Sequence, residues 1–207
     1  MHTLIHVLDL FGVMVFALSG ALVAARKGMD WMGFSLVAIV TGIGGGTLRD
    51  LLLDRPVYWL TQWYYLVLCI LTALATFYLA RHLHERLGWL LWADAIGLAA
   101  FTVIGNDVTL STGASPFIAV VMGVMTATFG GLIRDVLCGE PPLLLHREVY
   151  ATAALAGGIV FVSSLTLGLG DWVAALAAFL VTLIVRGLGI VYHLHLPSFP
   201  REEESGG

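Results

Sequence analysis

Seven apolar runs follow one another along this chain of 207 residues. Each is about 20 residues long, which is the length that an α-helix needs to cross a hydrocarbon core about 30 Å thick. The connections between the runs are short and leave no room for a soluble domain. The sequence therefore predicts an all-α integral membrane protein, a single membrane domain over residues 1–207 with seven transmembrane helices. The runs lie at about 7–25, 31–54, 62–82, 88–110, 116–138, 149–168 and 172–193.

The composition excludes several functional classes. Hydrophobic residues make up 59% of the chain and charged residues 12%, at a mean hydropathy of +0.93, far outside the range of soluble domains. No basic patch suits a nucleic acid, and no nucleophile elbow, paired metal-ligand spacing or phosphate loop suits an enzyme. We therefore expect no catalytic residues, no cofactor and no nucleic-acid partner. Membrane lipids are the expected surroundings, and the acidic tail at 197–207 is predicted to be disordered.

The positions of lysine and arginine predict the orientation, because positively charged loops stay in the cytoplasm. Six basic residues follow the odd-numbered runs, whereas the loops on the opposite side hold one arginine, Arg55. The six are Arg26, Lys27, Arg81, Arg86, Arg147 and Arg201. We therefore expect a multi-pass protein of the cell (inner or plasma) membrane, with its N-terminus outside and its C-terminus in the cytoplasm.

The chain repeats itself with an offset of 85 residues. "GIGGGTLRDLLLDRP" at 42–56 aligns without a gap with "ATFGGLIRDVLCGEP" at 127–141. The same offset pairs residues outside these segments, among them Asp9 with Asp94, Phe16 with Phe101, Thr41 with Thr126 and Tyr65 with Tyr150. Three runs per copy is an odd number, so the copies must face opposite ways, as in many transporters. We predict repeat 1 at about 5–85, repeat 2 at about 90–170, and a seventh helix at about 172–193 outside the repeat.

Glycines interrupt the second and fifth runs, at Gly44, Gly45 and Gly46 and again at Gly130 and Gly131. Glycine destabilises a helix interior by about 1 kcal/mol relative to alanine. We therefore predict a kink or an unwound turn in each helix. The alternative is that these small residues allow two helices to pack closely. In the second copy Phe129 stands where the first has Gly44, so the kink has less support there, and an aromatic plug in the path is predicted.

An adjacent arginine and aspartate lie one helical turn beyond the glycines in both copies, as Arg49 with Asp50 and Arg134 with Asp135. Ionisable groups inside a membrane are expensive and usually face a polar interior, so we assign these pairs a pore-lining or gating role. The alternative is that each arginine extends to the headgroups and the aspartate offsets its charge. The rest of the predicted polar set comprises Asp9, Asp94, Ser19, Thr41, Thr47 and Thr126. This set suits a hydrated monovalent cation or a small zwitterion, and it lacks the carboxylate cluster of a divalent-metal site.

The apolar runs, the repeat, "GGGTLRD" in the second run and "FGGLIRD" in the fifth resemble the prokaryotic members of the trimeric intracellular cation (TRIC) channel family. Bacterial relatives of this family are often described as glycine transporters. The resemblance implies a homotrimer with one hourglass pore per subunit, lined by the kinked second and fifth helices. It implies monovalent cations, mainly potassium, as the permeant ions. We add sodium as an alternative permeant ion and a bound lipid, and we expect no other metal. A glycine carrier remains the alternative function, and a structural or lipid-scaffold role is a third.

Overall fold

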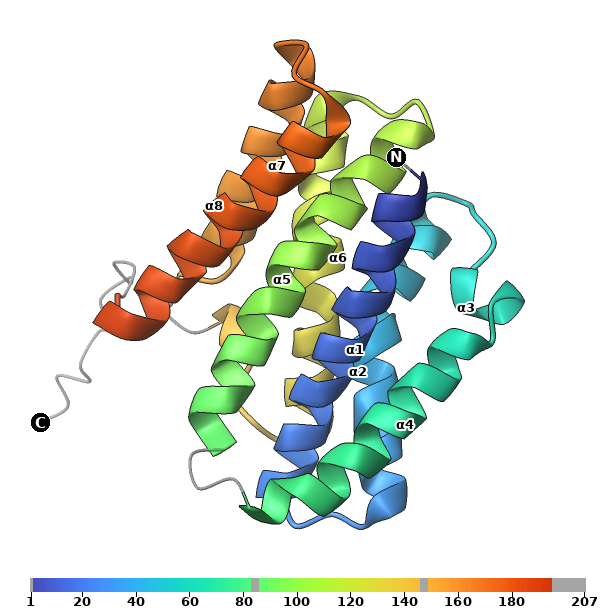
Figure 1. Ribbon diagram of the computed structural model, residues 1–207, viewed down its shortest axis with the longest axis vertical. Coiled ribbons are helices and arrows are strands. Elements are labelled where there is room, and N and C mark those ends of the chain that lie inside the picture. The colour runs from blue at the N-terminus through green and yellow to red at the C-terminus, as the bar shows by residue number, and fades with distance from the viewer. Residues whose placement is uncertain (1, 83–85, 146–148, 195–207) are drawn as a thin grey trace, which may run out of the picture.

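The computed structural model describes residues 2–82, 86–145 and 149–194, and in these ranges the fold is all-α, which confirms the predicted fold class (Figure 1). The predicted tail at 197–207 lies outside the described residues. Three short elements, α3 (Tyr58–Thr61), η1 (Ala80–His82) and η2 (Leu143–Leu145), belong to the connections. The longer helices are α1 (His2–Arg26), α2 (Trp31–Leu52), α4 (Tyr64–Leu79), α5 (Arg86–Ser111), α6 (Pro116–Leu137), α7 (Ala151–Thr166) and α8 (Asp171–Tyr192).

Five of the described helices, α1, α2, α5, α6 and α8, are long and apolar enough to cross a membrane. The predicted runs at 62–82 and 149–168 give shorter apolar helices, because α4 and α7 have 16 residues each. A span of the usual kind needs about 17 to 25 residues. In the first case Gln62 and Trp63 precede α4 and residues 80–82 form η1, so the apolar run is longer than its helix.

The helix ends show the same signals in both copies. After α1 and after α5 the chain turns through a glycine with positive φ, Gly28 at 65° and Gly113 at 81°. Glycine adopts this conformation without the steric penalty of a side chain, so it ends a helix well. The next helices begin with N-caps at equivalent positions: Asp30 accepts from the Gly33 N–H at 2.8 Å, and Ser115 accepts from the Ile118 N–H at 3.4 Å.

Two three-helix bundles lie side by side, one formed by α1, α2 and α4 and the other by α5, α6 and α7. They meet through contacts of α1 with α5 and of α2 with α6, while α8 packs on α5 and α7. At the first of these contacts the equivalent residues Phe16 and Phe101 stack, with centroids 5.2 Å apart. In Figure 1, α1 begins at the top and α5 at the bottom. The two copies therefore run in opposite directions, and the C-terminal ends of α2 and α6 lie at opposite ends of the molecule.

Candidate functional site

The glycines lie where α2 crosses α6. A Cβ atom added at Gly45 would collide with the carbonyl oxygen of Thr126, and one added at Gly130 would collide with the carbonyl oxygen of Thr41. These two contacts are related by the repeat, since each pairs a glycine of one copy with a threonine of the other. The two backbones therefore approach more closely than any larger residue allows.

The glycines do not unwind either helix. Both α2 and α6 are helical without interruption over their full lengths, so neither contains an unwound turn, and the predicted kink at these glycines stays a prediction. The alternative, close helix packing, describes this crossing. The threonine hydroxyls also remain within their helices, because Thr41 donates to the Val37 carbonyl at 2.6 Å and Thr126 donates to the Met122 carbonyl at 2.6 Å.

Other members of the predicted set flank this crossing. The Gly46 Cα faces the ring of Tyr58, since an added Cβ would lie 2.7 Å from it, and at Gly131 it would lie 2.9 Å from the Tyr150 hydroxyl. At Gly44 it would lie 3.2 Å from Ile133 Cδ1. Thr47 donates to the Ile43 carbonyl at 2.7 Å and accepts from the Trp59 indole at 2.9 Å. Phe129 is partly exposed on α6, and its role as a plug stays a prediction.

The first-repeat cluster consists of Asp9, Arg49, Asp50, Tyr58 and Tyr65. Arg49 reaches Asp50 Oδ1 through Nε at 2.9 Å and through Nη2 at 2.9 Å. Asp50 Oδ2 accepts from the backbone N–H of Tyr58 at 3.1 Å, which fixes the start of α3. Arg49 is only 4% exposed and Asp50 only 2%, so this ion pair is buried and does not extend to the headgroups. Tyr58 adds its ring, whose centroid lies 5.8 Å from the Arg49 guanidinium carbon.

Asp9 lies in the same cluster but forms no ion pair with Arg49 in the described part of the chain. Its Oδ2 accepts from the Tyr65 hydroxyl at 2.6 Å. The Tyr65 hydroxyl also lies 3.5 Å from Nδ1 of His6, which is exposed one turn before Asp9 on α1. A chain of polar groups therefore leads from the exposed His6, through the Tyr65 hydroxyl, to Asp9.

The second-repeat cluster consists of Asp94, Arg134, Asp135 and Tyr150. Arg134 Nε donates to Asp135 Oδ1 at 2.8 Å, and Asp135 Oδ2 accepts from the Leu143 N–H at 2.9 Å, as in the first copy. Arg134 Nη1 also donates to Asp94 Oδ1 at 2.7 Å and to the Ser19 hydroxyl. Ser19 belongs to the first repeat, so this guanidinium links the two bundles.

Sequence reasoning missed two groups of functional side chains. The repeat paired Tyr65 with Tyr150 but did not place either in a cluster. Arg186, a charge inside the seventh apolar run, was not singled out at all, although α8 buries it completely. Its guanidinium carbon lies 5.0 Å from the Tyr150 ring centroid, and its Nη1 donates to the Val149 carbonyl at 3.4 Å. Helix α8 thus adds a cation beside the second-repeat cluster.

A loop at each end joins the cluster to the other repeat. Glu140 follows α6. It pairs with Arg26, the last residue of α1, at 3.8 Å and with the next residue, Lys27, at 3.0 Å. The hydrogen bond and charge of Lys27, together with the charge of Arg26, hold the pKa of Glu140 below its usual value. A cavity of about 140 Å³ lies here, and Arg26, Asp135 and Glu140 are among the residues that line it. At the equivalent position Arg55 donates to the Ser111 hydroxyl, at 3.3 Å, and to the Val108 carbonyl, at 3.5 Å.

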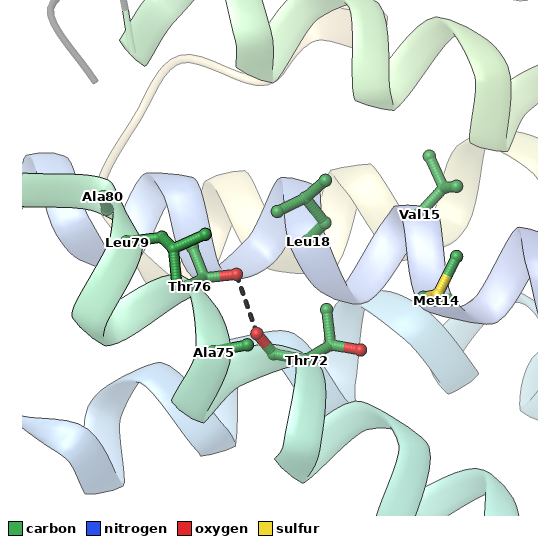
Figure 2. Close-up of a pocket in the computed structure, with 8 residues that line it drawn as sticks. All are labelled: Met14, Val15, Leu18, Thr72, Ala75, Thr76, Leu79 and Ala80. Carbon is green, nitrogen blue, oxygen red and sulfur yellow. Dashed lines mark hydrogen bonds between the residues drawn. The ribbon is translucent and has the colours of Figure 1, made fainter. Parts of the chain in front are cut away.

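A larger groove, of about 570 Å³, lies between α1 and α4 and contains no residue of either cluster (Figure 2). Its lining is apolar apart from two threonines whose hydroxyls bond within α4, Thr72 to the Leu68 carbonyl and Thr76 to the Thr72 carbonyl. This groove suits a hydrocarbon chain and offers no polar site.

The fold and the two clusters define a multi-pass membrane protein built from an inverted repeat. Each of the helices α2 and α6 buries one arginine–aspartate pair near its C-terminal end. The sequence model of the family described as glycine transporter matches residues 6–81 and 91–165. The chain belongs to this family, whose solved prokaryotic structures are the TRIC channels.

Curated relatives cover nearly the whole chain. The UPF0126 membrane protein of Vibrio cholerae is 44% identical over 200 residues, which are 95% of this chain and 83% of that protein. The UPF0126 inner membrane protein YadS of Escherichia coli is 41% identical over 203 residues, 97% of this chain and 98% of that protein.

Solved structures of TRIC channels have the same fold as this chain. The TRIC trimeric intracellular cation channel orthologue from Rhodobacter sphaeroides is 47% identical, with a TM-score of 0.91 over 93% of this chain and 100% of that one. A prokaryotic TRIC channel in 0.5 M KCl is 31% identical, with a TM-score of 0.88 over 95% and 100%.

Proposed function

We propose that this protein is a channel for monovalent cations, chiefly potassium, with sodium as a second permeant ion. The observation that carries this proposal is the likeness, over nearly the full length of both chains, to the TRIC cation channel orthologue. The two clusters support it, since each buries carboxylates beside an arginine at one end of α2 or α6. In each cluster the arginine offsets the charge of a neighbouring aspartate, so the net charge stays small, which suits an ion of low charge.

The assembly and orientation belong to the same proposal. We place the chain as a homotrimer in the inner membrane, with a pore in each subunit, lined by α2 and α6 and closed where the glycines cross. Lipids surround it, and the groove between α1 and α4 has the apolar lining that an acyl chain needs. We place the N-terminus outside, so the first-repeat cluster faces the exterior and the second-repeat cluster faces the cytoplasm.

Glycine transport is the second candidate, and the description of the family model favours it. A carrier for this zwitterion needs a donor for its carboxylate and an acceptor for its ammonium group. The first-repeat cluster holds both, because Arg49 Nη1 and Asp9 Oδ1 are buried without a hydrogen-bond partner in the described part of the chain.

Recordings from purified protein in planar bilayers separate the two candidates. We expect single-channel currents whose reversal potential follows the potassium gradient and stays the same when chloride is replaced by gluconate. Saturable uptake of labelled glycine into liposomes, without such currents, would replace the channel with the carrier. The absence of both would leave the scaffold role.

Labelling of single cysteines tests the orientation. In a chain with Cys69 and Cys138 replaced, Thr112→Cys and Lys27→Cys occupy equivalent exposed positions of the two repeats. We expect a membrane-impermeant maleimide, added outside intact cells, to modify the cysteine at 112 and not the one at 27. The reverse pattern would invert the proposed topology.

A further inference from the structure

One buried carboxylate oxygen in the first-repeat cluster has no hydrogen-bond partner. Asp9 Oδ2 accepts from Tyr65, but Oδ1 is buried and accepts from no described residue. Its equivalent, Asp94, forms an ion pair with Arg134 at 2.7 Å. Asp9 is partly buried and forms no ion pair in the described chain, and a carboxylate oxygen that is buried without a partner is unfavourable, so Oδ1 calls for a cation.

Arg49 does not supply that cation. Its Nε and Nη2 both bind Asp50 Oδ1, at 2.9 Å each, so its charge is offset by the neighbouring aspartate. The cluster therefore holds two carboxylates and one guanidinium, a net charge of one negative unit. In the second repeat, Arg186 adds a further cation beside the cluster, and two carboxylates face two guanidinium groups.

Uncharged oxygens lie around Asp9. The Tyr65 hydroxyl contacts it directly, and the ring of Tyr58 packs edge-on against Tyr65, with centroids 4.7 Å apart. The Tyr58 hydroxyl is buried without a hydrogen-bond partner in the described chain and lies within electrostatic range of Asp9. Arg49 leaves its Nη1 without an acceptor, so it can donate to a water molecule held by an ion. Carboxylate, hydroxyl and water oxygens are the ligands that hard cations prefer.

We propose that Asp9, with the hydroxyls of Tyr58 and Tyr65, binds one monovalent alkali cation in the first-repeat cluster. The net charge of one negative unit matches one monovalent ion. The described residues contain no group of three or more His, Cys, Asp or Glu side chains that could hold a metal ion, so a divalent cation lacks ligands here. This inference rests on the proposed function, since it names the place where the permeant ion is bound. The second repeat has no equivalent site, because Arg134 occupies it.

Crystals of the full-length protein soaked in thallium(I), a probe for potassium, locate the ion directly. We expect an anomalous peak beside Asp9 Oδ1 in the wild type and no peak there in Asp9→Asn. Peaks at other places only, or a peak at residue 9 that persists in the variant, would overturn the inference.

Thermal unfolding of the purified protein in detergent gives an independent measurement. Potassium should raise the unfolding midpoint above its value in N-methylglucamine for the wild type, because a ligand that binds the folded state stabilises it. Asp9→Asn should lose this increase, whereas Asp9→Glu should keep it. Asp30→Asn is the matched control, since it removes an exposed carboxylate while asparagine still caps α2, and it should respond as the wild type does.

An equal potassium response in wild type and Asp9→Asn would contradict the site. If Asp9→Asn fails to fold, the wild-type thallium peak and the Asp9→Glu response decide the question. The bilayer recordings are separate: potassium currents without a site at Asp9 would refute this inference and leave the channel intact. A thallium peak at Asp9 without currents would do the opposite.

Discussion

The two repeats use the same backbone devices but satisfy their buried charges differently. Both have the glycine crossing, the arginine bound to the adjacent aspartate, and an aspartate that accepts from the loop backbone, at Tyr58 and at Leu143. In the second repeat the arginine also binds Asp94 and Ser19. In the first, the ion pair that Arg49 forms among the described residues is with Asp50, and Asp9 accepts from a neutral hydroxyl. The backbone features that build the fold are preserved in both copies, and the side chains that decide what each end does have diverged.

The difference also extends to the connections between the repeats. The second-repeat end is joined to α1 through Ser19 and through the ion pairs of Glu140 with Lys27 and Arg26. At the first-repeat end, the polar contacts with α5 that the described residues show are the weaker ones of Arg55. Charged interactions are stronger in a medium of low dielectric constant. Movement that separates the bundles is therefore expected to be easier at the first-repeat end.

The largest effect is expected when the two equivalent aspartates are neutralised. Asp94→Asn removes one partner of a fully buried ion pair and should lower the free energy of unfolding by about 3 kcal/mol. Asp9→Asn removes a carboxylate that forms no ion pair in the described chain, so in potassium-free buffer it should leave stability unchanged or raise it. Thermal unfolding in N-methylglucamine measures both. Equal losses in both variants would remove the asymmetry between the two clusters.

Alanine at the helix crossing should act on both copies alike. Gly45→Ala and Gly130→Ala place a methyl group against the backbone of the other helix, so we expect losses of about 1 to 3 kcal/mol and reduced assembly. Size-exclusion chromatography measures the assembly, and thermal unfolding measures the loss of stability. Gly44→Ala is the matched control, because its methyl group would lie 3.2 Å from the flexible end of Ile133 and in ordinary contact, at 3.7 Å, with the Gly130 Cα. Normal stability in all three variants would mean that the crossing is wider than described.

A smaller effect is expected from the hydroxyl that links the bundles. Ser19→Ala removes one acceptor from Arg134 while Asp94 remains, so the free energy of unfolding should fall by about 1 kcal/mol. Ser35→Ala removes an exposed hydroxyl that bonds within α2 and should change stability by less than about 0.5 kcal/mol. Indistinguishable unfolding midpoints for the two variants would show that Ser19 contributes nothing to the second-repeat cluster.

The sequence was sufficient for the fold class and for the pairing of the copies, because apolar run length and a gap-free offset are local properties. It also supplied the alternatives for the glycines, but not the choice between unwinding and close packing. That choice depends on which backbone lies opposite Gly45, and α6 is distant in sequence. The amino-acid composition of a helix does not show whether its glycines unwind it or pack against the backbone of a neighbouring helix.

The partners of the arginines were beyond sequence reasoning for a related reason. The adjacent aspartates could be identified because they lie next to the arginines, but Ser19 lies 115 positions from Arg134. The repeat does not predict a role for Arg186, because α8 has no equivalent in it. A charge in the middle of an apolar run was a sufficient signal. Ionisable groups inside a membrane usually face a polar interior, and this rule, which pointed to Arg49, applies equally to Arg186.

The smallest effect concerns the ion pairs of the loop after α6, and it depends on pH. The pKa of Glu140 is lowered by Lys27 and Arg26, so its folded state holds the proton less tightly than the unfolded chain does. Its contribution to stability is therefore present above the pKa of the unfolded chain, about 4.3 for glutamate, and is lost as the pH falls through the lowered folded value. Because the pair is partly exposed, this contribution is at most about 1 kcal/mol.

A double-mutant cycle measures this interaction and tests whether the second-repeat end is held by charge. Glu140→Gln and Lys27→Met should each lower the unfolding midpoint slightly at pH 7, and the double variant should lose less than the sum of the two. At a pH below the lowered pKa of Glu140, the wild type and Glu140→Gln should unfold alike, because both side chains are then neutral. Additive losses at pH 7 would show that Glu140 and Lys27 do not interact. The two ends would then differ only in their buried clusters, and the exposed loops would not contribute to the asymmetry.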